Sequence, residues 1–270
     1  MTPGRSALGA TRAGVAGLAT LVAVGLGTPP AGATHDHRLT APAEVVGGLP
    51  LEGRVVVIDP GHQLGNHRYL DKIAQLVPAG GFLKPCNTTG TATDSGFPEA
   101  TLAWRVSLGL RDRLTALGAT VVLTRHSNRE DRWGPCVDVR GRAGNTIPAD
   151  LKISIHGDGS YAAGAHGFHV IAPTDRAPWT HDIYRSSRRL AVDTRAALRG
   201  VGLSVATYIA GGDGLDFRSD LGTLNLSDVP TVMVELGNMR NAADARRMTS
   251  VKGRATYARG LEHAVRRFLG

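Results

Sequence analysis

Short runs rich in apolar and β-branched residues recur along this chain and limit the folds that it can adopt. Five of them can be read from the sequence: residues 55–58, 119–123, 151–155, 168–172 and 231–234. A strand that is apolar on both faces is typical of a parallel sheet, because helices cover both sides of such a sheet. We therefore predict an α/β fold: a single domain with a mainly parallel, twisted sheet of about six strands and helices on both faces.

Amphipathic helical stretches separate several of these runs. The first begins at Pro98 and Glu99 and ends at Gly118, since proline suits the first turn of a helix and glycine the position after its end. Its apolar residues recur at helical spacing: Leu102, Val106, Leu110, Leu114 and Leu117. Residues 179–198 and 251–269 predict two further helices of the same kind.

The N-terminus has the pattern of a secretory signal peptide. Arg5 and Arg12 flank the start of an apolar stretch of about a dozen residues, which is shorter than the roughly 20 that a transmembrane helix needs. Three small residues at 31–33 (Ala-Gly-Ala) then suit cleavage by a signal peptidase. We predict a signal peptide over residues 1–33, secretion to the periplasm or cell wall, and no stable membrane insertion after cleavage. A retained membrane anchor is the alternative.

The rest of the chain predicts a linker at residues 34–50 and one domain at residues 51–270, since no repeat and no second block of composition is visible. Within the domain, residues 63–97 are rich in Gly, Pro, Thr and Ser and predict an inserted loop. Loops of this length are usually functional or mobile. Residues 71–77 suit a short helix or one arm of a hairpin.

The two cysteines, Cys86 and Cys136, lie far apart in the sequence and lack CxxC spacing. In an exported protein such a pair is most often a disulfide, because the compartment is oxidising. We therefore predict a bridge between them that ties the inserted loop to the body of the domain. Two buried free thiols, or thiolates bound to a metal, are the alternatives.

Polar residues follow several of the predicted strands at the point where each strand ends. His62 follows the first strand, His156 follows the third, and Glu235 follows the last. Because ligands bind beyond the carboxyl ends of parallel strands, we expect these side chains to share one rim with Glu99, the acid at the start of the first helix. Two imidazoles and a carboxylate are a typical set of ligands for a catalytic zinc, and a second, unbound carboxylate can transfer protons.

Each of these residues also has a simpler interpretation. A single histidine at a strand end is more often a hydrogen-bonded structural residue. The sequence around His62 suits a turn, Glu99 suits the positive end of a helix dipole, and Glu235 suits a buried ion pair. The combination is far more specific than any one of its members. Glu235 also follows a run of apolar residues, Val-Met-Val, where a charge is costly without a role or a partner.

Taken in order, these motifs resemble those of the zinc-dependent N-acetylmuramoyl-L-alanine amidases, which cleave bacterial peptidoglycan. The matching segments are 57–62 (Val-Ile-Asp-Pro-Gly-His), 122–125 (Val-Leu-Thr-Arg) with Arg140 and Asn145, 154–156 (Ser-Ile-His), and 230–237 (ending Val-Glu-Leu-Gly) with Met239 and Asn241. The resemblance extends from about residue 54 to the end of the chain, with an insertion in the 63–97 loop.

The resemblance implies that His62, Glu99 and His156 bind one Zn²⁺ ion and that Glu235 is the general acid/base. Asp94 is the alternative to Glu99 if the loop has a different register. The bond cleaved would join the lactyl group of N-acetylmuramic acid to L-alanine, in peptidoglycan or in muropeptide fragments. We expect an exported, monomeric zinc hydrolase.

Two segments depart from the family pattern. Asp158 stands in a His-Gly-Asp segment where many relatives have His-Ala-Asn, which affects substrate contacts near this residue. Residues 224–226 (Leu-Asn-Leu) replace a common Val-Leu-Arg, so a substrate-facing arginine is expected to be missing. Two other functions stay open: a zinc carboxypeptidase-like peptidase of similar sheet architecture, and a catalytically silent cell-wall-binding protein, against which the intact Glu235 argues.

Charge and composition bear on other partners. The chain has 31 Lys and Arg against 23 Asp and Glu, a net charge of +8. Its few aromatic residues and the lack of a binding motif argue against a nucleic-acid partner. The cluster Arg185, Arg188 and Arg189 predicts a solvated helix face, with attraction to an anionic cell wall as the functional alternative. Five other histidines are interpreted as structural: His67, His126, His166, His169 and His181.

Overall fold

A six-stranded sheet with the order β4-β1-β5-β8-β6-β7 forms the centre of the structure. Its strands are β1 (Val55–Pro60), β4 (Thr120–Leu123), β5 (Leu151–Asp158), β6 (His169–Pro173), β7 (Leu215–Arg218) and β8 (Thr231–Asn238). Strands β4, β1, β5 and β8 are parallel, β6 is antiparallel to β8, and β7 is parallel to β6. The predicted mainly parallel sheet is confirmed. β7 had not been predicted, because its sequence, Leu-Asp-Phe-Arg, is half polar.

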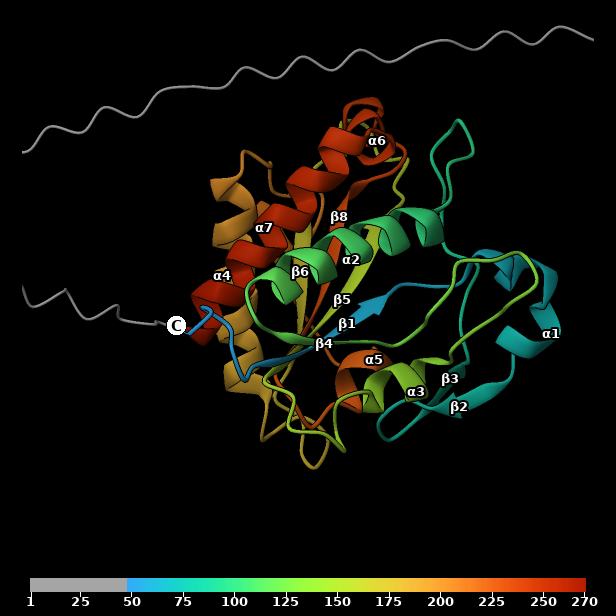
Figure 1. Cartoon of the computed structure of the whole chain (residues 1–270). Helices are drawn as coiled ribbons and strands as arrows, with labels where there is room; N and C mark the ends of the chain where they lie inside the picture. The colour runs from blue at the N-terminus through green and yellow to red at the C-terminus, as the bar shows by residue number, and fades with distance from the viewer. Residues whose placement is uncertain (1–47) are drawn as a thin grey trace, which may run out of the picture. The chain divides into compact units, whose positions relative to one another are not determined.

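This computed structural model describes residues 48–270, drawn in colour in Figure 1. The predicted signal peptide and residues 34–47 of the predicted linker lie outside the described residues. Among residues 48–270, no helix combines the length and the apolar character that crossing a membrane requires.

The helices lie on both sides of the sheet (Figure 1). They are α1 (Leu70–Ile73), α2 (Glu99–Ala116), α3 (Val137–Arg142), α4 (Tyr184–Gly200), α5 (Gly222–Asn225), α6 (Ala242–Thr249) and α7 (Val251–Leu269), with short 3-10 turns η1 (Leu64–Arg68) and η2 (Ala210–Gly212). The three predicted helices correspond to α2, α4 and α7. α4 begins later than predicted, because Thr180 Oγ1 accepts a hydrogen bond from Arg176 N and closes a turn before it.

Alternating residues along the central strands divide the core into two layers. Leu151, Ile153 and Ile155 of β5 pack with α2 and α7 in the larger apolar cluster. Met233 of β8 packs on the other face, with Leu224 of α5. Residues of β5 and β8 that share this second face therefore point toward α3 and α5, which leave room for a cleft at the carboxyl edge of the sheet.

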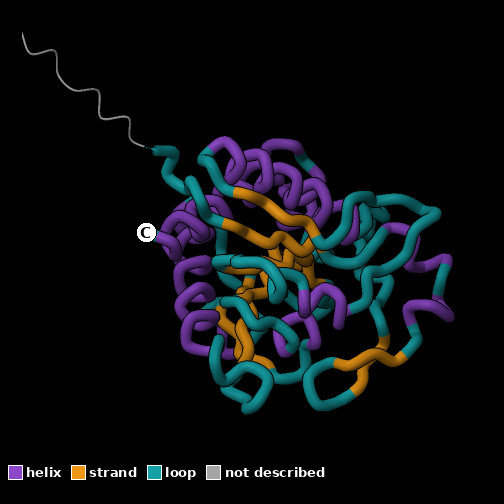
Figure 2. Tube along the Cα trace, turned by 60° about the horizontal axis from the view of Figure 1, so that its bottom comes forward, coloured by secondary structure: helices purple, strands orange, loops and turns teal. Residues whose placement is uncertain are grey.

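The predicted insertion contains its own small structure. α1 is followed by a hairpin of β2 (Leu76–Pro78) and β3 (Leu83–Pro85), which lies apart from the main sheet in Figure 2. The prediction of a short helix or hairpin arm at residues 71–77 is therefore confirmed on both counts, since the segment holds part of α1 and of β2. Lys84 binds the backbone oxygen of Asp220 at 2.7 Å and joins the hairpin to the segment before α5.

Cys86 and Cys136 form a disulfide, as predicted, with their Cα atoms 4.3 Å apart. Cys86 follows the hairpin directly, and Cys136 immediately precedes α3. Val137 N also donates a hydrogen bond to Cys86 O at 2.7 Å, so the covalent link and a backbone hydrogen bond act at the same place. The insertion is thus fixed to the domain directly after its hairpin.

Replacing both cysteines by serine should lower the free energy of unfolding by about 4 kcal/mol, because the bridge spans 50 sequence positions and restricts the unfolded chain. Denaturant titration of the oxidised native protein and of the double variant would measure the difference. Reduction of the native protein should reproduce it, and a reduced protein as stable as the oxidised one would contradict this expectation.

Candidate metal centre and cleft

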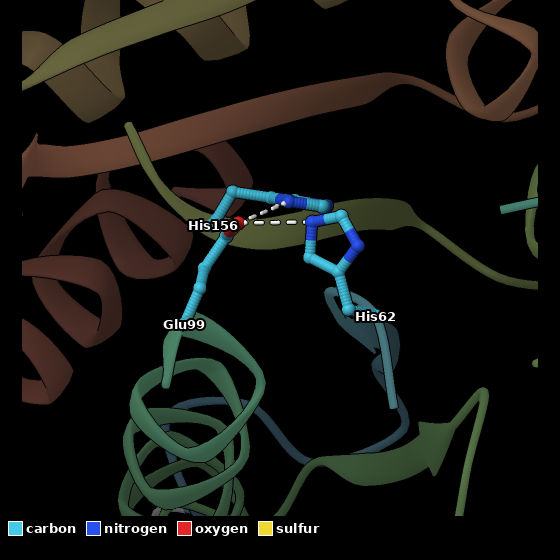
Figure 3. Close-up of side chains that lie close together, drawn as sticks. All are labelled: His62, Glu99 and His156. Carbon is cyan, nitrogen blue, oxygen red and sulfur yellow. Dashed lines mark hydrogen bonds and ion pairs between the residues drawn. The ribbon is translucent and has the colours of Figure 1, made fainter. Parts of the chain in front are cut away.

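Three side chains from distant parts of the sequence meet at the carboxyl edge of the sheet. His62 follows β1, Glu99 is the first residue of α2, and His156 belongs to β5. Each offers one nitrogen or oxygen atom, and these atoms lie within 4.8 Å of one another. Figure 3 shows the Glu99 carboxylate facing both rings, with Glu99 Oε1 2.8 Å from His156 Nδ1 and 3.1 Å from His62 Nε2. The structure therefore brings together the three residues that the sequence selected as ligands.

Residues of the insertion orient two members of this cluster. His62 Nδ1 lies 3.1 Å from Thr88 O and 3.2 Å from Asn87 Oδ1, so Nε2 is directed toward Glu99. Thr91 N donates to Glu99 Oε2 at 2.9 Å, which leaves Oε1 facing the imidazoles. Asn87 carried no signal in the sequence, because its position depends on how the insertion folds.

The electrostatics of the cluster favour an ionised Glu99. Burial alone would raise the pKa of this carboxyl, but the charge on His62 and hydrogen bonds from both rings hold it below its usual range. Two nitrogen donors and an ionised oxygen donor, grouped at the wall of a cleft, are a donor set that suits Zn²⁺.

Two buried arginines hold the backbone on which His62 sits. His62 has a φ of 53°, in the left-handed region that costs energy for a residue with a side chain. Arg140 Nη2 donates to His62 O at 2.7 Å, and Arg125 Nη2 donates to Gly61 O at 3.2 Å and to Ala100 O at 2.9 Å. These bonds join the His62 loop to the first turn of α2, which carries Glu99.

Asp59 anchors Arg140 beneath the site. The two form an ion pair at 2.6 Å with both side chains buried, and Ser154 Oγ donates to Asp59 Oδ2 at 2.7 Å. Burial opposes ionisation of Asp59, but the Arg140 charge and hydrogen bonds from Ser154 and Thr124 hold its pKa below the usual range. Removal of one partner from such a pair typically costs about 3–5 kcal/mol.

Glu235 lies one strand away from the cluster. It is the register partner of His156, in β8. Burial, followed by the charges of Glu99 and Asp158, raises the pKa of Glu235 well above its usual value. Its Oε2 atom is buried and has no hydrogen-bond partner among residues 48–270. The carboxyl is thus set apart from the three clustered residues, in an environment that favours holding a proton.

These side chains line one cleft with a volume of about 410 Å³. Its lining includes His62, Glu99, His156, Glu235 and Asp158, with Lys84 and Arg140 on the side of the insertion and α3. The cleft thus brings together the predicted metal ligands and the predicted acid/base, and it is large enough for part of a peptide or sugar substrate.

The structure decides several alternatives that the sequence left open. Asp94 is exposed and pairs with Arg240 at 3.1 Å, so Glu99, not Asp94, joins the two histidines. Asp158 accepts a hydrogen bond from Tyr208 Oη at 2.9 Å at the cleft wall. Asn225, in the segment that departs from the family pattern, is buried and donates to Ala79 O at 2.9 Å. At that position the side chain supports the hairpin.

Among the histidines interpreted as structural, the surroundings differ. His67 and His181 lie at the surface beside Glu130 and Asp175. His169 is instead buried and is the register partner of Glu235 on the side away from His156. Nothing in the sequence could show this, because β6 has no motif and its register is a tertiary property.

The fold and the site agree with a comparison against known families. A model of the N-acetylmuramoyl-L-alanine amidase family matches residues 56–267. The chain belongs to this family.

Three of the similar proteins come from mycobacteria. The chain is 42% identical over 221 residues to the N-acetylmuramoyl-L-alanine amidase Rv3717 of Mycobacterium tuberculosis, covering 81% of this chain and 88% of the relative. The structure is similar to the amidase Ami1 of Mycobacterium abscessus (42% identity, TM-score 0.75, 81% of this chain and 100% of that one). It is also similar to Ami1 of Mycobacterium smegmatis (37% identity, TM-score 0.75, 82% and 98%).

Gly90 allows a test of the close packing around the cluster. It has a φ of 75°, and a Cβ atom there would lie 2.8 Å from Glu99 Oε2 and 2.9 Å from His62 Cδ2. Gly90→Ala should therefore displace these side chains and lower kcat/KM for a muropeptide by roughly a hundred-fold, the usual cost of an ~1 Å misplacement.

Gly96→Ala is the matched control. Gly96 lies in the same loop with a φ of 85°, but a Cβ atom there would meet nothing within 4 Å. It should carry a similar backbone strain and keep the native rate. Equal rates in the two variants would show that the loop does not constrain the cluster.

Proposed function

We propose that this chain is an exported zinc amidase that cleaves the bond between the lactyl group of N-acetylmuramic acid and L-alanine, in peptidoglycan or its fragments. The observation that carries the proposal is the meeting of His62, Glu99 and His156 at one wall of a cleft, with Glu235 one strand away. Membership in the amidase family supports the choice of bond.

His62, Glu99 and His156 would hold one zinc ion, through Nε2, Oε1 and Nδ1 respectively. The fit rests on the atoms that face one another across the cluster and on the partners that hold them: Thr88 O and Asn87 behind His62, and Thr91 N behind Glu99. Such outer partners fix the tautomer and the direction of a ligand. When bound, the ion would polarise the amide carbonyl and make a water molecule acidic near neutral pH.

Glu235 would carry the protons of the reaction. In its ionised form it accepts a proton from the attacking water, and it then delivers this proton to the leaving nitrogen of L-alanine. Its separation from the three clustered residues matters, because a carboxylate that serves as a ligand is not free for this task. Burial favours the protonated form that the second step requires.

Export is supported by the disulfide, since such bridges persist in oxidising compartments and are rare in a reducing cytosol. Peptidoglycan is also outside the cytoplasmic membrane. We propose that the predicted signal peptide directs the chain there and that the mature enzyme acts as a monomer.

Metal content tests the proposed ligands. The native protein should contain one zinc per chain, and His156→Ala should lose it, since a ligand set of two side chains cannot replace three. Elemental analysis after gel filtration would measure this. His181→Ala removes a surface histidine of the same kind and should keep the metal. Full zinc content in His156→Ala would refute the assignment.

Substitution of Glu235 separates catalysis from metal binding. Glu235→Gln should keep zinc and lower the turnover of a muropeptide by about 10²–10⁴-fold, the usual contribution of a general acid/base. Mass spectrometry of released stem peptides gives the rate, and Glu130→Gln, which changes an exposed carboxylate, is the control. Release at the native rate by Glu235→Gln would remove the residue from the mechanism.

The same mass spectra distinguish the competing functions. An amidase releases stem peptides with a free N-terminal L-alanine, whereas a carboxypeptidase-like enzyme releases amino acids from the other end. A silent wall-binding protein would sediment with insoluble wall and release neither product.

A further inference from the structure

Glu235 stands between two histidines in the sheet. On one side its register partner is His156 of β5, a member of the metal cluster. On the other side its register partner is His169, the first residue of β6. Side chains directly opposite each other in neighbouring strands share a face, with Cβ atoms about 4.5–5.5 Å apart in an antiparallel pair. His169 and Glu235 are therefore immediate neighbours on the face that holds the cleft.

Both residues have a buried polar atom without a partner. Among residues 48–270, neither Glu235 Oε2 nor His169 Nδ1 has a hydrogen bond, although both atoms are hidden from solvent. His169 is only 3% exposed. An unsatisfied buried group costs about 1–3 kcal/mol, so two of them on adjacent side chains indicate a contact that another state of the protein makes.

Glu235 is the polar side chain directly opposite His169 in the sheet; the charges of Asp158, Asp216 and Arg218 also act on the ring. On the β7 side, Val170 pairs with Leu215, so the position next to His169 belongs to Gly214, which has no side chain. Tyr208 stands edge-on with its ring centre 6.4 Å away, and its hydroxyl donates to Asp158. Burial lowers the pKa of His169, so the ring is neutral and has one N–H donor.

We propose that His169 is a positioning residue for Glu235: its imidazole forms a hydrogen bond with the Glu235 carboxyl when substrate fills the cleft, and so fixes the carboxyl for proton transfer. This inference rests on the proposed function of Glu235. Directly opposed side chains of an antiparallel pair are close enough for such a bond, and catalytic hydrogen bonds are often incomplete without substrate. His169 keeps its own proton throughout, since the protons of the reaction pass through Glu235 alone.

Two substitutions of His169 separate hydrogen bonding from packing. His169→Leu keeps much of the volume but removes the donor and acceptor. His169→Asn places an amide near the position of Nδ1 and can bond to Glu235. We expect His169→Leu to lower kcat by roughly ten- to a hundred-fold, with KM within about twofold of native, because the carboxyl loses its orientation while the substrate still binds. His169→Asn should recover most of this loss.

Thr231→Val is the matched control. Thr231 lies at the opposite end of β8, its hydroxyl is also buried without a partner, and valine has nearly the same shape. It should keep the native kcat. Zinc content and the denaturation midpoint, measured for every variant, show whether a loss of rate is local. If His169→Leu keeps the native kcat, or if His169→Asn is as slow as His169→Leu, the inference is overturned.

Combination with Glu235→Gln distinguishes this inference from the proposed function. If His169 acts through Glu235, adding His169→Leu to Glu235→Gln should cause no further loss, because the function that it supports is already gone. An additional ten-fold loss would show an independent role and would refute the inference. If Glu235→Gln alone keeps the native rate, the proposed function fails; if it is inactive while His169→Leu is fully active, only the role of His169 fails.

Discussion

The buried ion pair between Asp59 and Arg140 determines how the site is built. Asp59 is the last residue but one of strand β1, and Arg140 reaches it from α3 on the open face of the sheet. The same guanidinium bonds the backbone oxygens of Pro60 and His62, so a single side chain satisfies a buried charge and shapes the turn that presents His62. Without this anchor, the left-handed backbone at His62 would lose one of the two arginines that hold it, and the direction of the ring toward Glu99 would be less well fixed.

Much of the sheet could be predicted because its central strands are buried on both faces. The run at residues 55–58 is apolar throughout, and that composition is typical of a strand in a parallel sheet. β7 lies at the edge, is partly exposed and alternates between polar and apolar residues, so no such run marks it. The antiparallel direction of β6 had no signal either, since an apolar run is the same in both directions along the chain.

The candidate site also contains residues that could be predicted from the sequence and residues that could not. His62, His156 and Glu235 could be selected because the carboxyl ends of the strands meet at one edge of the sheet, and Glu99 because the helix that it begins was expected to start near the same rim. The supporting roles of Asn87, Arg125 and His169 could not be predicted, since these residues are placed beside the site only by the folded insertion, the loop after β4 and the register of β6. His169 is the clearest case, because as an isolated residue in an apolar strand it has every feature of a structural histidine.

The insertion contributes residues that hold the side chains of the site. Within six residues of Cys86, it supplies Asn87 and Thr88 behind His62, the close glycine at position 90, and the backbone N–H of Thr91 that fixes Glu99. A flexible segment could not hold two side chains in this way, because each contact must offset the entropy of ordering it. The disulfide lies at the start of this stretch and joins it to α3, the helix that carries Arg140. The disulfide and the Asp59–Arg140 pair therefore stabilise the same part of the structure. The disulfide holds the segment of the insertion that contacts His62, and the ion pair holds the turn that carries His62.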